Sequence, residues 1–225
     1  YRYDHTGSVN LQVEKGENLI EKEKYIKLLL TDIAVDIIFV VKSYEKKAIK
    51  KIFGICSGKG GVGKSTIALH MAFELRDLGY KVGVLDAEIF TPSIPFLLNS
   101  NHVPSSVDGD SIEVIHTHGI QMLSMGLFIQ NNQAIVWQTN IMSSGFRQLL
   151  QQGNWNVDYL IIDFPPGVNE IYEICKTLLQ EIEMIIVTGS SKLMYTDTTR
   201  LYVVLKTYGV YVKGIVENNA YNFRI

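Results

Sequence analysis

A glycine-rich segment between an apolar run and a helical pattern restricts the fold of this chain more than any other feature. The apolar run covers residues 52–56, the glycine-rich segment covers 58–65, and the helical pattern continues to residue 78. The glycines allow backbone amides to turn inward and approach phosphate oxygens that side chains would keep at a distance. Because the positive end of the helix points at the same place, the segment predicts a phosphate-binding loop.

The side chains of this loop match the chemistry of a nucleoside triphosphate bound with Mg²⁺. Lys64 places a point charge near the β- and γ-phosphates, and the hydroxyl of Ser65 is a magnesium ligand. A glycine-rich turn without a ligand is the alternative, but the preceding strand and the following amphipathic helix favour the binding loop. We therefore expect ATP to be bound by Gly58, Lys59, Gly60, Gly61, Val62, Gly63, Lys64, Ser65 and Thr66.

Apolar runs alternate with helical patterns along the rest of the chain. The runs cover residues 52–56, 81–85, 159–162, 184–187 and 210–216, and the helical stretches lie near 65–78, 170–179 and 196–208. The first helix is expected to have an apolar face made of Ile67, Met71, Leu75 and Leu78. This alternation indicates an α/β fold, with a mostly parallel sheet covered by helices on both faces, as in P-loop NTPases.

Residues 1–50 differ from residues 51–225, which form the expected P-loop ATPase domain. The first segment has charged stretches at 14–17 and 21–24, which fit a solvated helix or a mobile arm. A β-branched run at 33–41 predicts one strand. We interpret residues 1–50 as an arm or as the remnant of a small extra domain, without a defined role.

Two carboxylates end predicted strands close to the loop. Asp86 follows the 81–85 run and Asp163 follows the 159–162 run, and ligands of such sheets bind at the carboxyl ends of the strands. Asp163 is expected to hold magnesium through an ordered water. Asp86 is expected to orient the attacking water, to bind magnesium through water, or to accept hydrogen bonds from the phosphate loop. Gly167, after two prolines, permits close approach of the backbone to the γ-phosphate.

The second residue of the loop, Lys59, resembles the deviant Walker A motif of the MinD/ParA/nitrogenase-reductase class. In that class this lysine reaches across a nucleotide-sandwich dimer to the partner's phosphates. The resemblance implies a homodimer in the ATP state, in which Lys59 is catalytic because it supplies a cation in trans. The alternative is an exposed lysine in a flexible loop.

Three further segments resemble the Mrp/ApbC iron–sulfur cluster carrier ATPases, and this resemblance covers roughly residues 51–220. They read Asp86-Ala87-Glu88-Ile89-Phe90-Thr91-Pro92-Ser93-Ile94-Pro95, Asp158-Tyr159-Leu160-Ile161-Ile162-Asp163-Phe164-Pro165-Pro166-Gly167 and Gly214-Ile215-Val216-Glu217-Asn218-Asn219-Ala220. By this resemblance Glu88 positions the attacking water, and Asn218 reads the adenine ring. The resemblance also implies an iron–sulfur cluster as cargo, and iron–sulfur client proteins as partners.

Several positions depart from the family pattern, and they predict slow hydrolysis. Glu88 stands where the family has Asp, so its carboxylate is one methylene further from the backbone. After Gly167 the family continues Thr-Gly-Asp, whereas this chain reads Val168-Asn169-Glu170. Residues 137–140 and 188–191 also differ from the family pattern.

The cluster ligands of the family have no counterpart within this sequence. Relatives have a Cys-x-x-Cys pair where this chain reads Tyr221–Ile225, so a [4Fe–4S] cluster shared across a dimer is expected only if cysteines follow. Cys56 and Cys175 are expected to pack in the core. His116 and His118 are expected to be ordinary polar strand residues, because no third metal ligand lies near them in the sequence.

Composition limits the partners and the location. The formal net charge of −2 gives no reason to expect nucleic acid. The run at 37–41 is too short to cross a bilayer, so we expect no membrane association. Two cysteines fit a reducing cytoplasm. Two alternatives stay open, a MinD/ParA-like positioning switch, and a non-hydrolysing nucleotide-sensing adaptor without a cluster, which Glu88, Val168 and Asn169 would favour.

Overall fold

The structure, a computed structural model, describes residues 2–3, 9–13, 37–41, 49–88, 91–100, 102–104, 106–107, 111–128, 139–175 and 181–219. The chain divides into two compact units, Tyr1–Lys46 and Lys47–Ile225. Within the described ranges, no helix is both long enough and apolar enough to span a bilayer.

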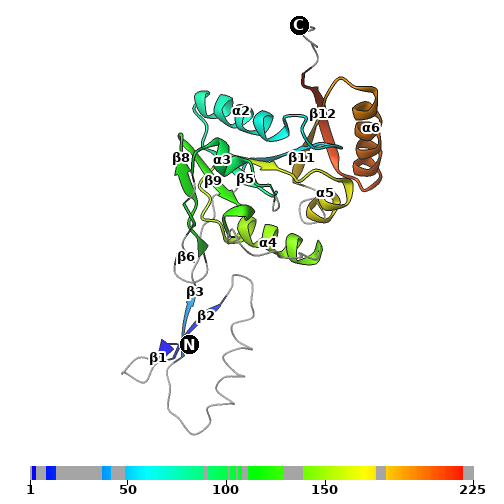
Figure 1. Cartoon of the computed structure of the whole chain (residues 1–225). Coiled ribbons are helices and arrows are strands. Elements are labelled where there is room, and N and C mark those ends of the chain that lie inside the picture. The colour runs from blue at the N-terminus through cyan, green and yellow to red at the C-terminus, as the bar shows by residue number, and fades with distance from the viewer. Residues whose placement is uncertain are drawn as a thin grey trace. The chain divides into compact units, whose positions relative to one another are not determined.

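The first unit contains one small sheet in the strand order β1-β2-β3 (Figure 1). These strands are β1 Arg2–Tyr3, β2 Val9–Val13 and β3 Ile37–Val41. The first pair is antiparallel and the second is parallel. The strand β3 lies inside the run at 33–41 that was predicted to be a strand. The charged stretches at 14–17 and 21–24 lie outside the described residues.

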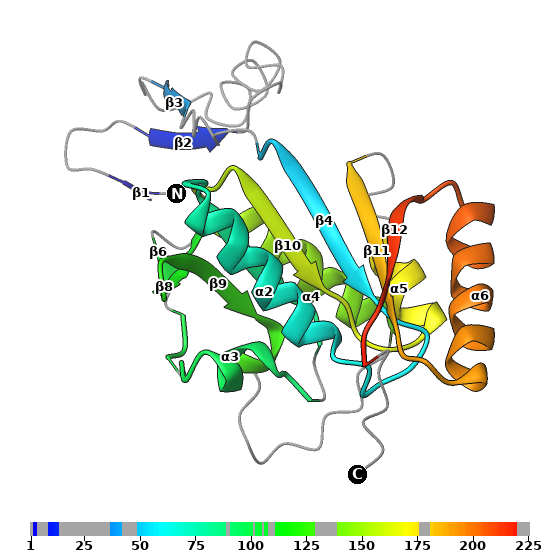
Figure 2. The same ribbon diagram turned by 90° about the horizontal axis from the view of Figure 1, so that it is seen from above.

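The second unit contains a seven-stranded sheet in the order β12-β11-β4-β10-β5-β9-β8 (Figure 2). Its neighbouring strands are parallel except β8, which is antiparallel to β9. The predicted mostly parallel sheet is therefore confirmed. A separate two-stranded ribbon is formed by β6 Ser106–Val107 and β7 Ser111–Ile112. The strands of the large sheet are β4 Lys51–Cys56, β5 Val82–Asp86, β8 Ile115–Thr117, β9 Ile120–Ser124, β10 Tyr159–Asp163, β11 Ile182–Thr188 and β12 Tyr211–Glu217.

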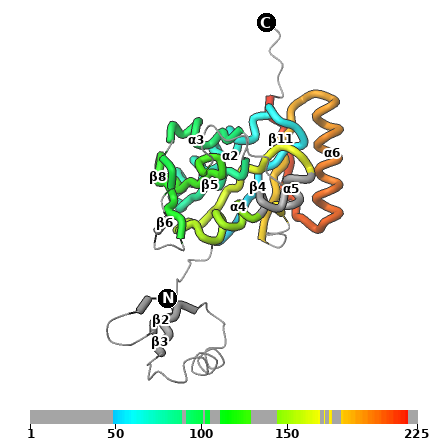
Figure 3. The backbone as a smooth tube through the Cα atoms, turned by 60° about the horizontal axis from the view of Figure 1, so that its bottom comes forward, coloured from blue at the N-terminus to red at the C-terminus, as the bar shows by residue number. Residues whose placement is uncertain are grey.

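Helices cover both faces of this sheet, as the sequence pattern predicted (Figures 2 and 3). One apolar cluster lies between the sheet and α2, and a second lies between the sheet and α4, α5 and α6. The helical elements are α2 Lys64–Asp77, α3 Ile94–Leu97, the 3-10 helix η1 Met125–Phe128, α4 Thr139–Gln152, α5 Val168–Cys175 and α6 Lys192–Thr207.

The face of α2 that meets the sheet differs from the predicted one. Ala68, Leu69 and Ala72 are buried in α2, whereas the expected face residues Ile67, Met71 and Leu75 are only partly buried and Leu78 is 72% exposed. Small side chains let a helix approach the sheet closely, so the alanine stripe takes the contact and the larger residues flank it. Leu78 follows the last residue of the helix and does not share its apolar face.

The predicted start of α6 was also wrong by four residues. The helix begins at Lys192 because Ser191 caps it, and the Ser191 hydroxyl accepts a hydrogen bond of 3.3 Å from the amide of Met194. The predicted helix near 170–179 corresponds to α5, whose described part ends at Cys175.

The sheet order brings the predicted functional segments to one edge. β10 lies between β4 and β5, with Asp163 opposite Ile55 on one side and Asp86 on the other. Because all three strands are parallel, the loops that follow them emerge together at their carboxyl ends.

Candidate functional site

The phosphate loop has two glycines with left-handed backbone geometry. Gly61 has a φ of 79° and Gly63 has a φ of 85°, which residues with a Cβ rarely adopt. A Cβ at Gly63 would also collide with the side-chain amide of Asn218, and one at Gly58 would lie 2.8 Å from the backbone of Asp197. Gly60 has open space around its Cβ position, so only some glycines of the loop are required by packing.

The lysine at the end of the loop pairs with the carboxylate at the end of β10. Lys64 is 9% exposed, and its Nζ lies 2.5 Å from Oδ1 of the fully buried Asp163. The hydroxyl oxygen of Ser65 is 3.5 Å from the same Nζ. The second carboxylate oxygen of Asp163 is buried and receives no hydrogen bond from the described residues. A buried carboxylate oxygen without a donor is costly, so this atom marks a position suited to a water or a cation.

Asp86 is also fully buried, but hydrogen bonds engage both of its oxygens. Oδ1 accepts a bond of 3.0 Å from the amide of Glu88, and Oδ2 accepts bonds from the amide of Ile94 at 3.3 Å and from the Ser124 hydroxyl at 3.1 Å. The sequence analysis expected donors from the phosphate loop, whereas the donors in the structure are Glu88, Ile94 and Ser124. Burial, and then the charge of Asp163, raise the pKa of Asp86 to about 7.

Glu88 and Gly167, the other two residues expected near the γ-phosphate, follow the carboxyl ends of β5 and β10. Glu88 is buried, at 7% exposure, two residues beyond the end of β5. Gly167 has a φ of 119° directly before α5, which supports the need for glycine there. The side chains of Asn169 and Glu170 lie outside the described residues, as do Ala134–Trp137 and Tyr221–Ile225.

Asn218 connects the end of β12 to the phosphate loop. Its backbone amide donates to the carbonyl of Thr188 at 2.7 Å, and its side-chain Nδ2 donates to the carbonyl of Val62 at 2.9 Å. The structure therefore brings the residue predicted to read the base directly onto the loop predicted to hold the phosphates.

Lys59 pairs with a carboxylate that the sequence analysis did not identify. Its Nζ lies 3.4 Å from Oδ2 of Asp197 on α6, and Arg200 lies 3.4 Å from the other oxygen of the same carboxylate. The Lys59 side chain is 40% exposed. Asp197 is one carboxylate on a helix far along the chain, and no motif spacing relates it to the loop. Ser124 was missed as well, because it belongs to none of the three segments on which the sequence analysis relied.

The two cysteines are core residues, as predicted. Both are buried free thiols. Burial raises the pKa of Cys175 to about 12 and raises the pKa of Cys56 still further, so neither has the thiolate character of a cluster ligand.

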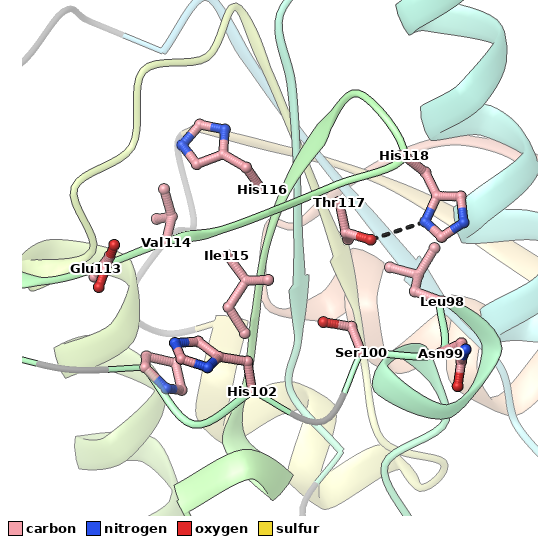
Figure 4. A pocket seen from close by; sticks show the side chains of 11 residues that line it. Leu98, Asn99, Ser100, His102, Glu113, Val114, Ile115, His116, Thr117 and His118 are labelled. Atoms are coloured by element: carbon pink, nitrogen blue, oxygen red, sulfur yellow. Dashed lines mark hydrogen bonds between the residues drawn. The ribbon is translucent and has the colours of Figure 1, made fainter.

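The histidines that the sequence analysis considered line a cavity of about 460 Å³ beside the edge strand β8 (Figure 4). His116 belongs to β8, but His118 lies in the following turn with a φ of 49°, so the prediction of a strand position for His118 was wrong. No group of three candidate metal-binding side chains occurs among the residues that the structure describes.

Comparisons with known proteins identify a family and relatives of this chain. A model of the NUBPL iron-transfer P-loop NTPase family, of the ParA group, matches residues 48–224. An iron-sulfur cluster carrier protein of Synechocystis is 40% identical over 77% of this chain and 50% of its own length. That of Rickettsia bellii is 35% identical over 97% of this chain and 71% of its own length. This chain thus spans about half the length of the Synechocystis relative.

A solved structure shows the same fold with a bound nucleotide. The nucleotide-binding protein of Archaeoglobus fulgidus in complex with ADP has a TM-score of 0.64 and 28% identity, over 75% of this chain and 66% of its own.

Proposed function

The chain belongs to the family of NUBPL iron-transfer P-loop NTPases, and from this membership we propose a function. The protein binds ATP with Mg²⁺ and hydrolyses the ATP slowly. As a homodimer, it uses this nucleotide cycle to load iron–sulfur clusters or to transfer them to client proteins. The observation that carries the nucleotide part is the buried pair of Lys64 and Asp163 at the mouth of the phosphate loop. A cytoplasmic location belongs to the same proposal, and the two free thiols support it.

The loop residues bind and orient the triphosphate in this proposal. The amides of residues 58–66 surround the phosphates, and Lys64 exchanges Asp163 for the β- and γ-phosphate oxygens. This exchange replaces one close anion by another, so the buried ammonium is never left without a counter-charge. Asn218 holds the loop from the side of the base.

The residues around the loop fit a magnesium ion. The free oxygen of Asp163 and the hydroxyl of Ser65 are hard oxygen donors, and magnesium is commonly held by one or two protein oxygens, water and phosphate oxygens. The ion would neutralise charge on the phosphates. When Lys64 turns to the phosphates, Asp163 becomes free to orient a water at this position. Both carboxylate oxygens of Asp86 already accept hydrogen bonds, so we propose that Asp86 positions the segment that carries Glu88 instead of binding the ion.

Glu88 and Lys59 supply the remaining groups. Glu88 orients the attacking water, and its extra methylene relative to Asp accounts for slow turnover. Lys59 leaves Asp197 and reaches the phosphates bound by a second copy of the chain. The Lys59 side chain is 40% exposed, and a partly solvated ion pair is weak. Both facts support the release of Lys59 from Asp197.

The cargo rests on family membership. Cys56 and Cys175 do not fit cluster ligands, because both are buried and their pKa values are raised. We propose that the cluster is bound by thiolates other than these two.

The nucleotide part is tested by ATP binding and magnesium-dependent phosphate release. We expect Lys64→Ala to abolish ATP binding, because the phosphates lose their buried cation. Lys51→Ala is the matched control, since Lys51 begins β4, the strand that leads into the phosphate loop, at the end away from that loop, and forms a partly exposed ion pair with Glu183. Equal loss of binding in both variants, or unchanged binding in Lys64→Ala, contradicts the assignment.

The cargo part is tested by anaerobic reconstitution of the full-length protein with iron and sulfide. We expect about four irons per dimer and a visible absorption band, both retained in Cys56→Ala and in Cys175→Ala. No stable iron in the parent would remove the carrier function and favour the adaptor. Iron lost in either variant would instead make that cysteine a ligand.

A further inference from the structure

The loop between β5 and α3 carries Glu88, and one carboxylate holds both ends of this loop. Asp86 accepts a hydrogen bond from the amide of Glu88 with one oxygen and from the amide of Ile94 with the other. The amides of Glu88 and Ile94, one near each end of the loop, are therefore held by the same side chain. A shift of the Asp86 carboxylate would therefore move the backbone at both Glu88 and Ile94.

A third donor fixes that carboxylate from the neighbouring strand. Ser124 is fully buried at the end of β9, and Asp86 and Ser124 are opposite each other in the parallel pair of β5 and β9. Its hydroxyl donates to Oδ2 of Asp86 at 3.1 Å and accepts from the amide of Gly126 at 3.2 Å. Because the Gly126 amide can only donate, the hydroxyl hydrogen of Ser124 is directed to Asp86.

The turn that orients Ser124 also touches the loop directly. A Cβ on Gly126 would collide with the ring of Pro92, so the backbone of η1 lies against the distal part of the loop. Ser124 thus contacts both groups that hold the loop. These are the Asp86 carboxylate, which binds the amides of Glu88 and Ile94, and the η1 backbone, which lies against Pro92.

We propose that Ser124 is a positioning residue for the hydrolysis proposed above. By directing its hydroxyl to Asp86, it keeps the amides of Glu88 and Ile94 on that carboxylate, and it thereby positions the carboxylate of Glu88 relative to the phosphate loop. It does so without belonging to the phosphate loop or to the base-binding position. This inference rests on the proposed function for its catalytic consequence, but the loop contact itself is tested without hydrolysis.

The first measurement is hydrogen exchange of the nucleotide-free protein, followed by mass spectrometry. In Ser124→Ala we expect the amides of Glu88 and Ile94 to exchange about tenfold faster, because their acceptor loses its third donor. Peptides from the phosphate loop should exchange as in the parent. Gln121→Ala is the matched control, because Gln121 is a buried polar residue of the same strand that bonds to Asn156 instead of Asp86.

The second measurement is steady-state kinetics. Ser124→Ala should lower kcat about tenfold with an unchanged KM for ATP, and it should cause no further loss in a Glu88→Gln background. Unchanged exchange at Glu88 and Ile94, equal acceleration in Gln121→Ala, or additive losses in the double variant overturns the proposal. If the parent hydrolyses no ATP, the proposed function fails, and the exchange result alone still decides the role of Ser124.

Discussion

The side-chain amide nitrogen of Asn218 donates a hydrogen bond of 2.9 Å to the carbonyl oxygen of Val62, 156 positions earlier in the chain. This bond uses one of the two N–H donors of the Asn218 amide and fixes the side of the amide that faces the phosphate loop. We expect the side-chain oxygen on the other side to face the base. An oxygen acceptor matches the exocyclic amino group of adenine and not the carbonyl oxygen that guanine has at that position.

The first prediction therefore concerns the choice of nucleotide. We expect Asn218→Ala to weaken ATP binding about tenfold and to narrow the preference for ATP over GTP, because both ends of the amide are lost. Equilibrium binding of the two nucleotides with magnesium measures this. The exposed Asn154, whose backbone amide bonds to Ile112, serves as the control when replaced by Ala. An unchanged ratio of the two affinities would show that Asn218 does not read the base.

The second prediction concerns the ion pair of Lys59 and Asp197. Lys59→Ala should retain ATP binding but lose ATP-dependent dimerisation and hydrolysis. Asp197→Asn should instead favour the dimer by a few-fold, since it frees Lys59 from a pair that is worth about 0–1 kcal/mol at a partly solvated site. Sedimentation analysis with ATP reports both effects. Parent-like dimerisation and turnover in Lys59→Ala contradict the assignment of this lysine.

The third prediction concerns Glu88. Glu88→Asp should raise kcat with little change in ATP affinity, because the shorter side chain restores the family geometry. Glu88→Gln should lower kcat by about 100-fold or more, the usual contribution of a positioned acid or base. Phosphate release and ATP binding are measured on all three proteins. If the parent binds ATP tightly but turns over only as Glu88→Gln does, the non-hydrolysing adaptor becomes the better description.

The fourth prediction concerns the pH dependence of stability. Burial raises the pKa of Asp86 from 3.8 to about 7, so between these values the folded protein keeps a proton that the unfolded chain has lost. The stability contributed by this group is therefore full below pH 4 and is lost as the pH rises towards 7. The free energy of unfolding of the parent, relative to Asp86→Asn, should fall across this window. The comparison is made by denaturant unfolding without magnesium, and a flat or rising difference is inconsistent with the raised pKa.

The architecture of the second unit followed from the sequence because its signals are local. The glycine-rich loop, the apolar run before it and the helix after it are neighbours in the chain, and each apolar run that ends in a carboxylate became a parallel strand. Asp86 and Asp163 could be placed at one edge, because parallel strands end on the same side of their sheet. Burial of Cys56 was predictable in the same way, from its place in an apolar run, and Cys175 was predicted to pack in the core because no residue near it has metal-ligand spacing.

The particular partners of these residues were decided only by the tertiary structure. Asp197 meets Lys59 because α6 packs beside the phosphate loop, and Ser124 meets Asp86 because β9 lies next to β5. Neither pair has a sequence spacing that would reveal it, since strand order and helix packing determine which distant side chains meet. The same reason explains why α2 uses Ala68 and Ala72 against the sheet instead of its larger apolar residues. The residue types at the site are thus determined by the sequence, and their contacts by the packing of strands and helices that are distant in the chain.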